Sequence, residues 1–418
     1  MNTKTVILFL FLMLTFGNSK GQAVSGGLED YLNTYIASLP GSSGNDYTQA
    51  ITSQLNDWTV VVNEILNQNI SAAQTTASAF NYQVIEYTDT VNLPGQLYYI
   101  LEEKSPQTNY WGVYVFNASP CRENLILQAP HPKFDSNTGK QAVYCFTRLN
   151  AKALFISGTH RCNHSSFSSC DGTTTVCSET SSAYPISDMA HNTDTAFQKT
   201  TAALLSANSN AVFIQLHGFG KKSTDPYVIM SNGTRVTPTI DYSTQIQNEL
   251  SLTDNSLTFK VAHVDLSWTR LIGFTNTQGR LINSSSSVCD TNASNSNGGF
   301  IHIEQEKNKL RLDSIGWEKV NTSLSNVFSC NTLTITEQNI TQKGFKVYPN
   351  PVNATQIIIE ANQISRVSLL DLNGRTIINK DYRQKSTVKL DVRWLSSGMY
   401  FLVIESGNAT FNQKVIVN

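Results

Sequence analysis

The segment AVFIQLHGFG, residues 211–220, decides the fold class of this chain. Its first six residues are a short, mostly apolar run, which is typical of a buried β-strand. The run ends at His217, and residues 193–207 before it have the apolar spacing of a helix. A helix that leads into a buried strand is typical of α/β architecture.

Similar apolar runs recur on both sides of that segment. Helical stretches separate these runs, which lie at residues 125–129, 153–157, 260–264 and 300–303. Strands that alternate with helices indicate a mixed or parallel sheet covered on both faces. We therefore expect an α/β fold, a mixed sheet flanked by helices of the phosphorylase/hydrolase-like kind, over residues 111–330. In such folds the functional loops lie at strand ends.

The preceding region, residues 23–110, is predicted to lead into that sheet. Apolar residues between positions 26 and 80 recur at helical spacing and predict two helices. Strands are predicted at residues 82–87, 96–102 and 110–116.

The first 22 residues have the pattern of a signal peptide. Lys4 precedes an apolar run over residues 6–14, and small and polar residues follow. The run is much shorter than the about 20 apolar residues of a membrane helix, and no later run is long enough either. We expect cleavage during export and no transmembrane anchor in the mature chain.

Composition excludes one class of partner. The net charge is -1 and only 15% of the 418 residues are charged. Without a basic stripe, electrostatic capture of a phosphate backbone is not expected, so the sequence predicts no nucleic acid partner.

Seven cysteines lie in the middle of the chain, at positions 121, 145, 162, 170, 177, 289 and 330. In an exported protein this distribution predicts disulfides, and the odd number leaves at least one thiol free or paired between molecules. The pairing stays open. No C-x2-C pair exists, which disfavours a zinc ribbon.

The last section, residues 335–418, is predicted to be a small all-β sandwich. Asn373-Gly374 is typical of a hairpin turn between two of its strands. Three motifs follow in order: VYPNP at 347–351, LDLNG at 370–374 and LSSGMYF at 395–401. In these motifs the section resembles the C-terminal sorting domain of type IX secretion cargo of Bacteroidota. The resemblance implies export across the outer membrane, with the type IX machinery as a partner and a secreted or cell-surface location.

Histidines follow two of the predicted strands. His131 comes after the strand at 125–129 and shares a short loop with Asp135, while His217 ends its own strand. Zinc binds imidazole nitrogen and carboxylate oxygen well, and three such ligands leave a fourth position open for water. The sequence therefore predicts a Zn²⁺ site made by His131, Asp135 and His217. Asp135 also suits ordinary turn chemistry.

Glu304 is the predicted general base of this site. Alternation along the strand that starts at Phe300 places His302, Glu304 and Glu306 on one face. Burial on a mostly apolar strand would raise the pKa of a carboxyl group toward neutrality, which suits proton transfer. Glu306 is the second choice.

The middle section resembles N-formylglutamate amidohydrolases and, more distantly, zinc carboxypeptidases. Pro130-His131, Leu216-His217-Gly218, the NTQGR loop at 276–280 and Ile303-Glu304 carry the likeness in order. The resemblance implies His131 and His217 as zinc ligands and Glu304 as catalytic base. It places Asn276 and Arg280 in a substrate loop. Asp135 departs from the carboxypeptidase pattern, because it follows the histidine by four positions instead of three.

Further polar residues have more than one interpretation. Arg161 follows the strand at 153–157, and its guanidinium has the fork geometry that binds a substrate carboxylate. Arg311 is another candidate for that role. Asp188 and His191 precede the predicted helix, and each suits either a helix cap or a contact that orients a metal ligand.

The predicted function is a secreted zinc-dependent hydrolase that uses metal-activated water. It would cleave an amide or peptide bond in a carboxylate-bearing substrate, a small peptide or an N-acyl amino acid. The alternative is a non-catalytic binding or adhesion protein on a degenerate hydrolase fold. A serine hydrolase is disfavoured because the sequence has no G-x-S-x-G elbow.

Overall fold

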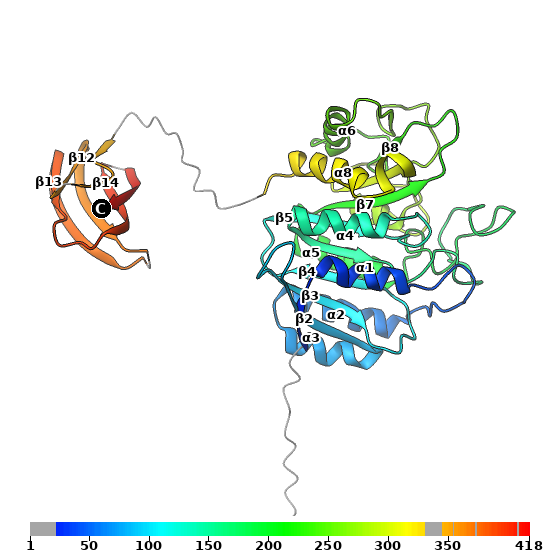
Figure 1. Cartoon of the computed structure of the whole chain (residues 1–418). Helices are drawn as coiled ribbons and strands as arrows, with labels where there is room; N and C mark the ends of the chain where they lie inside the picture. The colour runs from blue at the N-terminus through cyan, green and yellow to red at the C-terminus, as the bar shows by residue number, and fades with distance from the viewer. Residues whose placement is uncertain (1–21, 331–344, 354, 373, 408) are drawn as a thin grey trace, which may run out of the picture. The chain divides into compact units, whose positions relative to one another are not determined.

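The computed structural model describes residues 22–330 and 345–418, apart from residues 354, 373 and 408. The chain divides into two compact units, with the division between residues 332 and 333 (Figure 1). The predicted signal peptide lies outside the described residues except for its last residue, Gln22.

The larger unit is built on one ten-stranded sheet in the order β1-β2-β3-β4-β6-β5-β7-β10-β8-β9. Its strands are β1 (Gln22–Gly26), β2 (Tyr82–Asp89), β3 (Leu97–Glu103), β4 (Val113–Asn117), β5 (Arg122–Ala129), β6 (Ala151–Ile156), β7 (Val212–Phe219), β8 (Val228–Ser231), β9 (Phe259–Val261) and β10 (Phe300–Glu306). The central strands β6, β5, β7 and β10 are parallel neighbours. Antiparallel pairs flank them on both sides, which confirms a mixed α/β sheet. Strands from the region 23–110 and from 111–330 belong to this one sheet.

Helices cover both faces of the sheet. One layer holds α1 (Leu28–Ser38), α4 (Thr138–Leu149), α8 (Ser314–Val327) and α6 (Tyr242–Thr253), and each of these helices contacts the next in this order. The other holds α2 (Thr52–Leu66), α3 (Ile70–Ala77), a 3-10 turn η1 (Ser78–Phe80), α5 (Ala196–Ala207) and α7 (Thr277–Ile282). A π-helical turn, η2 (Lys307–Arg311), follows β10. Each face of the sheet therefore buries its own apolar core.

The region predicted to hold two helices holds three. Gln68 takes a left-handed φ of 62° and separates α2 from α3. A left-handed residue cannot continue a right-handed helix, so α2 ends before it.

Trp58 of α2 is the centre of the second core. It is fully buried among aromatic rings, and its indole Nε1 donates to Thr200 Oγ1 of α5 at 2.8 Å. We expect Thr200→Val, which keeps the shape but leaves the indole N–H without a partner, to lower the free energy of unfolding by about 1–3 kcal/mol. Chemical denaturation measures this change. Ser206→Ala at the exposed end of the same helix is the control and should stay within about 0.5 kcal/mol.

Three disulfides confirm the interpretation of the cysteines. They join Cys121 to Cys330, Cys162 to Cys177 and Cys170 to Cys289. Cys145 is free and buried, which accounts for the odd number.

The smaller unit is an antiparallel β domain, as expected. Its strands are β11 (Phe345–Tyr348), β12 (Gln356–Leu370), β13 (Thr376–Asp391), β14 (Gly398–Ser406) and β15 (Ala409–Val417). Strand β12 is long, and its pairing with β13 is irregular between its two halves. Val352 forms an isolated bridge with Val417 of β15, and the buried apolar residues of this unit form one core.

Among the residues that the structure describes, we find no helix with the length and hydropathy of a membrane span.

Candidate metal centre

Three neighbouring parallel strands bring the predicted residues to one edge of the large sheet. His131 follows the end of β5 by two residues, and His217 of β7 pairs directly with Glu304 of β10. Because parallel strands end on the same side of a sheet, side chains near their carboxyl ends converge. All three side chains are buried.

His131, Asp135 and His217 bring three donor atoms together. A backbone hydrogen bond from Asp135 N to His131 O closes one turn of the chain, so the carboxylate of Asp135 lies next to the imidazole of His131. Asp135 Oδ2 lies 3.3 Å from His131 Nδ1 and 3.2 Å from His217 Nδ1. Zinc bonds of about 2.0–2.2 Å in a tetrahedron place ligand atoms roughly 3.3–3.6 Å apart. The two distances to Asp135 Oδ2 therefore suit a zinc ion, and the ligand atoms of all three residues lie within 4.8 Å of one another.

The other nitrogen of each imidazole is held by an acceptor. His131 Nε2 lies 2.9 Å from Asp188 Oδ1, and His217 Nε2 lies 2.8 Å from Gln215 Oε1. Such contacts fix the tautomer and the orientation of a histidine that binds a metal through its opposite nitrogen. Both rings thus present Nδ1 to the space beside Asp135.

Electrostatics keep two of these groups in the form that binds a cation. Burial lowers the pKa of His217 to about 4, so its imidazole is neutral. Burial would raise the pKa of Asp135, but hydrogen bonds from His131 and His217 outweigh it and hold that pKa well below its usual range. A neutral imidazole and an ionised carboxylate are the ligand forms that zinc requires.

Glu304 lies beside this group with an oxygen that is not used. Its Oε1 is 3.7 Å from His302 Nε2, while its buried Oε2 has no partner among the described residues. Burial first, and then the charge of Asp135, raise the pKa of Glu304 to about 8. A buried carboxyl group with a free oxygen has the geometry and basicity of a proton acceptor.

Buried groups of both signs lie at this edge. Asp135, Asp188 and Glu304 are buried carboxyl groups, and Arg161 and Arg311 are buried guanidinium groups near them. Burial and Arg161 would lower the pKa of His131, but Asp188 and Asp135 outweigh them and raise it. A metal ion at His131 Nδ1 would take the place of a proton there, because a metal binds the neutral form of imidazole.

Asp188 connects Arg161 to the histidines. Arg161 Nη2 donates to Asp188 Oδ2 at 2.5 Å, and Arg161 Nη1 lies 3.5 Å from His131 Nδ1. Burial would lower the pKa of Arg161, but the neighbouring carboxylates Asp188 and Asp135 raise it. Arg161 is therefore a fixed positive charge next to the three donor atoms.

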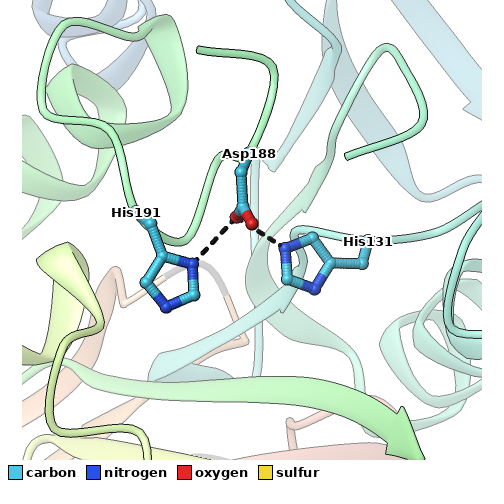
Figure 2. A group of neighbouring side chains, drawn as sticks. All are labelled: His131, Asp188 and His191. Atoms are coloured by element: carbon cyan, nitrogen blue, oxygen red, sulfur yellow. Dashed lines mark hydrogen bonds and ion pairs between the residues drawn. The ribbon is translucent and has the colours of Figure 1, made fainter. Parts of the chain in front are cut away.

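Figure 2 shows Asp188 between two imidazole rings, those of His131 and His191. His191 Nδ1 lies 3.0 Å from Asp188 Oδ1. The ligand atoms of these three residues also come within 4.8 Å of one another. However, Asp188 Oδ1 already accepts from both rings and from Ala190 N, and Oδ2 accepts from Arg161. We therefore assign hydrogen bonds to this group.

A third group of possible ligands, His217, His302 and Glu304, shares a histidine with the first. His217 Nε2 contacts Gln215, so the nitrogen that could bind an ion is Nδ1, which faces Asp135. The donors most ready for a cation are those of His131, Asp135 and His217.

The residues of the NTQGR loop have structural contacts. Asn276 caps α7 and donates to Gln215 Oε1 at 2.5 Å. Arg280 donates to the backbone oxygens of Phe274 and Cys289 and to Asn292 Oδ1. Asn276 reaches the cavity described below, whereas the guanidinium of Arg280 holds loops together.

Two other predicted candidates also have local partners. Glu306 caps the π-helical turn by accepting from Asn308 N and Lys309 N. Arg311 donates to backbone oxygens of Ser136, Gln305 and Phe219. Of the glutamates predicted on β10, Glu304 is therefore the one that faces the donor atoms.

A cavity of about 610 Å³ opens over these residues. His131, Arg161, His217 and Glu304 form part of its lining, as do His191, His302 and Tyr184. Its rim includes the segment 173–176, whose ends are close to the disulfides at Cys170 and Cys177. The cavity has the size of a small-ligand site.

The smaller unit is similar to a known protein family. Residues 346–418 match the family model of the secretion system C-terminal sorting domain. This unit is a type IX sorting domain. A chain that carries this sorting domain is exported through the matching secretion machinery and is secreted or displayed at the cell surface.

The chain is also similar to solved structures. A candidate metallopeptidase from Shewanella amazonensis aligns over 65% of this chain and 95% of its own, with 13% identity and a TM-score of 0.29. A candidate carboxypeptidase A from Shewanella denitrificans aligns over 60% and 67%, with 11% identity and a TM-score of 0.30. These TM-scores are too low to assign a shared activity. No curated protein matches this chain significantly in sequence.

Proposed function

We propose that this chain is a secreted zinc-dependent hydrolase that cleaves an amide or peptide bond. The observation that carries the proposal is the convergence of His131, Asp135 and His217 beside the unpartnered oxygen of Glu304. His131 Nδ1, Asp135 Oδ2 and His217 Nδ1 would hold the zinc ion. Bound zinc would supply Lewis acidity for the scissile carbonyl and for a water molecule.

Side chains of the protein transfer the proton and hold the imidazoles in position. Glu304 takes a proton from the attacking water, because its free oxygen and raised pKa suit a base near neutral pH. Asp188 and Gln215 keep the two imidazoles in position. The buried location of the reacting groups excludes bulk water and strengthens each electrostatic interaction.

Arg161 is the proposed contact for a substrate oxygen. Asp188 holds one of its terminal nitrogens, while its buried Nε has no partner among the described residues. Arg161 also lines the cavity. This arrangement suits a carboxylate-bearing substrate, and we propose small peptides and N-acyl amino acids as the class.

Metal content and hydrolysis test this function together. The mature protein, purified without chelator, should contain about one zinc ion per chain by mass spectrometry. It should hydrolyse at least one member of a panel that contains N-formylglutamate, N-acetylglutamate, N-acetylalanine, Ala-Glu and Ala-Ala. Absence of zinc together with absence of hydrolysis would instead favour a binding protein.

Gln215 offers a smaller test of the same centre. Gln215→Met removes the acceptor for His217 Nε2 while keeping the length of the side chain. We expect the zinc dissociation constant to rise about 10–100-fold, because partners of metal-binding histidines contribute this much. Competition with a fluorescent chelator measures it. Gln141→Met is a matched control, since Gln141 is buried but contacts Gln305 and Leu310 instead.

A further inference from the structure

His191 is a residue of the cavity that the proposed function leaves without a task. Its ring stacks on Tyr184 with centroids 3.6 Å apart and planes 6° apart. Its Nδ1 lies 3.0 Å from Asp188 Oδ1, and the residue lines the cavity beside His131 and Glu304. Both its position and its rotation are thus fixed at the reacting groups.

The second nitrogen of His191 is turned away from Asp188. Figure 2 shows His131 and His191 on opposite sides of the carboxylate, with their remaining nitrogens directed to the same side. On His131 that nitrogen is Nδ1, the donor atom next to Asp135. On His191 it is Nε2, for which no hydrogen bond is found among the described residues. His191 Nε2 therefore faces the space in which a substrate would react.

Holding Asp188 in place does not require His191. Arg161, His131 Nε2 and Ala190 N already donate to that carboxylate. The contact acts instead on His191, because Asp188 orients its imidazole. Burial lowers the pKa of His191 and outweighs the opposite effect of Asp188, so the ring is neutral before it takes up a proton. An imidazole oriented by a carboxylate at Nδ1, with Nε2 free in a cavity, is a recurring arrangement for proton transfer.

We propose that His191, oriented by Asp188, is a second proton-transfer residue of this site and delivers a proton to the leaving nitrogen. The inference rests on the proposed hydrolase function. It assigns a residue to the second step of the reaction, in which the amine leaves. In that step the carbon–nitrogen bond breaks, and its electron pair stays on the nitrogen. The nitrogen takes the proton from His191 Nε2 and leaves as an amine.

The proton balance closes within the cavity. The water molecule gives its oxygen and one hydrogen to the carbonyl carbon and one proton to Glu304. Glu304 releases that proton to the water of the cavity. His191, which is neutral between turnovers, takes up one proton from that water and gives it to the leaving nitrogen. The products are one carboxylic acid and one amine, and both residues return to their initial states.

His191→Asn tests the proposal. Asparagine can still donate to Asp188 from a position near that of Nδ1, but it has no group at the place of Nε2. Two substrates with the same acyl group are compared: the N-acyl amino acid that the wild type cleaves fastest, and the 4-nitrophenyl ester of that acyl group. Nitrophenolate leaves without a proton, so only the amide needs His191. Zinc content is measured on the same samples, and His164→Asn, outside this cavity, is the control.

We expect His191→Asn to lower kcat for the amide about 100–1,000-fold, the size of a general acid contribution, and kcat for the ester less than about fivefold. Zinc should stay at about one ion per chain. Equal losses on both substrates, or no loss on the amide, would overturn the assignment while leaving the hydrolase intact. A wild type that cleaves neither substrate would contradict the proposed function itself, and the inference with it.

Discussion

His217→Ala should abolish both the zinc content of the protein and its hydrolysis of every amide substrate. The side chain supplies one of three donor atoms, and Asp135 Oδ2 would keep only His131 Nδ1 as a neighbour in the group. Two remaining ligands do not hold zinc at the affinity of three. Loss of the ion removes several kcal/mol of stabilisation of the transition state, so kcat/KM should fall by more than about a thousandfold.

Zinc per chain and kcat/KM are measured on the same preparation of His217→Ala. His164→Ala, which changes a histidine outside the cavity, should retain both. Circular dichroism shows whether the variant is folded. If folded His217→Ala still binds one zinc ion at wild-type affinity, His217 is not a ligand and the proposed centre is wrong.

Glu304→Gln should separate metal binding from catalysis. Glutamine has the size of glutamate but cannot take a proton from water, and position 304 is not among the three donors closest to one another. We expect the zinc content to remain at about one ion per chain while kcat falls about 100–10,000-fold, the range of a general base. Zinc analysis and steady-state kinetics on the best amide substrate provide both numbers.

Glu306→Gln is the matched control for that experiment. It lies two residues further along the same strand, and it caps the π-helical turn instead of facing the donors. Its activity should stay within a few-fold of the wild type. Full activity in Glu304→Gln would show that another group takes the proton, and it would remove Glu304 from the proposed mechanism.

The apolar pattern of the sequence predicted the central strands and the residues at their ends, because both depend on local sequence. The apolar run before His217 forms β7, and the runs at 125–129 and 300–303 form its two neighbours, β5 and β10. Because parallel strands end at one edge, the side chains that follow them could be expected to meet. The structure brings His131, Asp135, His217 and Glu304 together at that edge.

The partners of these residues were harder to predict, because they depend on tertiary contacts. Asp188 lies in a long irregular segment between β6 and α5, and local sequence left its role open. The cap of α5 is Thr195, which accepts from Gln198 N, so Asp188 is free to join the histidines. Gln215 lacks the negative charge expected behind a zinc ligand, yet its amide oxygen contacts His217.

Arg280 was predicted to contact substrate, but the structure gives it structural partners. Its position in a glycine-containing loop suggested a substrate contact, but loop packing determines where its guanidinium points. Three of its nitrogens bond to oxygens of Phe274, Cys289 and Asn292, and the residue is almost completely buried. No local pattern distinguishes an arginine that binds a ligand from one that satisfies backbone carbonyls.

The location of a bound ion tests the central claim most directly. A crystal of the protein, purified without chelator, can be measured above and below the zinc absorption edge. We predict one anomalous peak within about 2.0–2.2 Å of His131 Nδ1, Asp135 Oδ2 and His217 Nδ1. A peak at another group, such as His191 and Asp188, or no peak near these three atoms, would contradict the account.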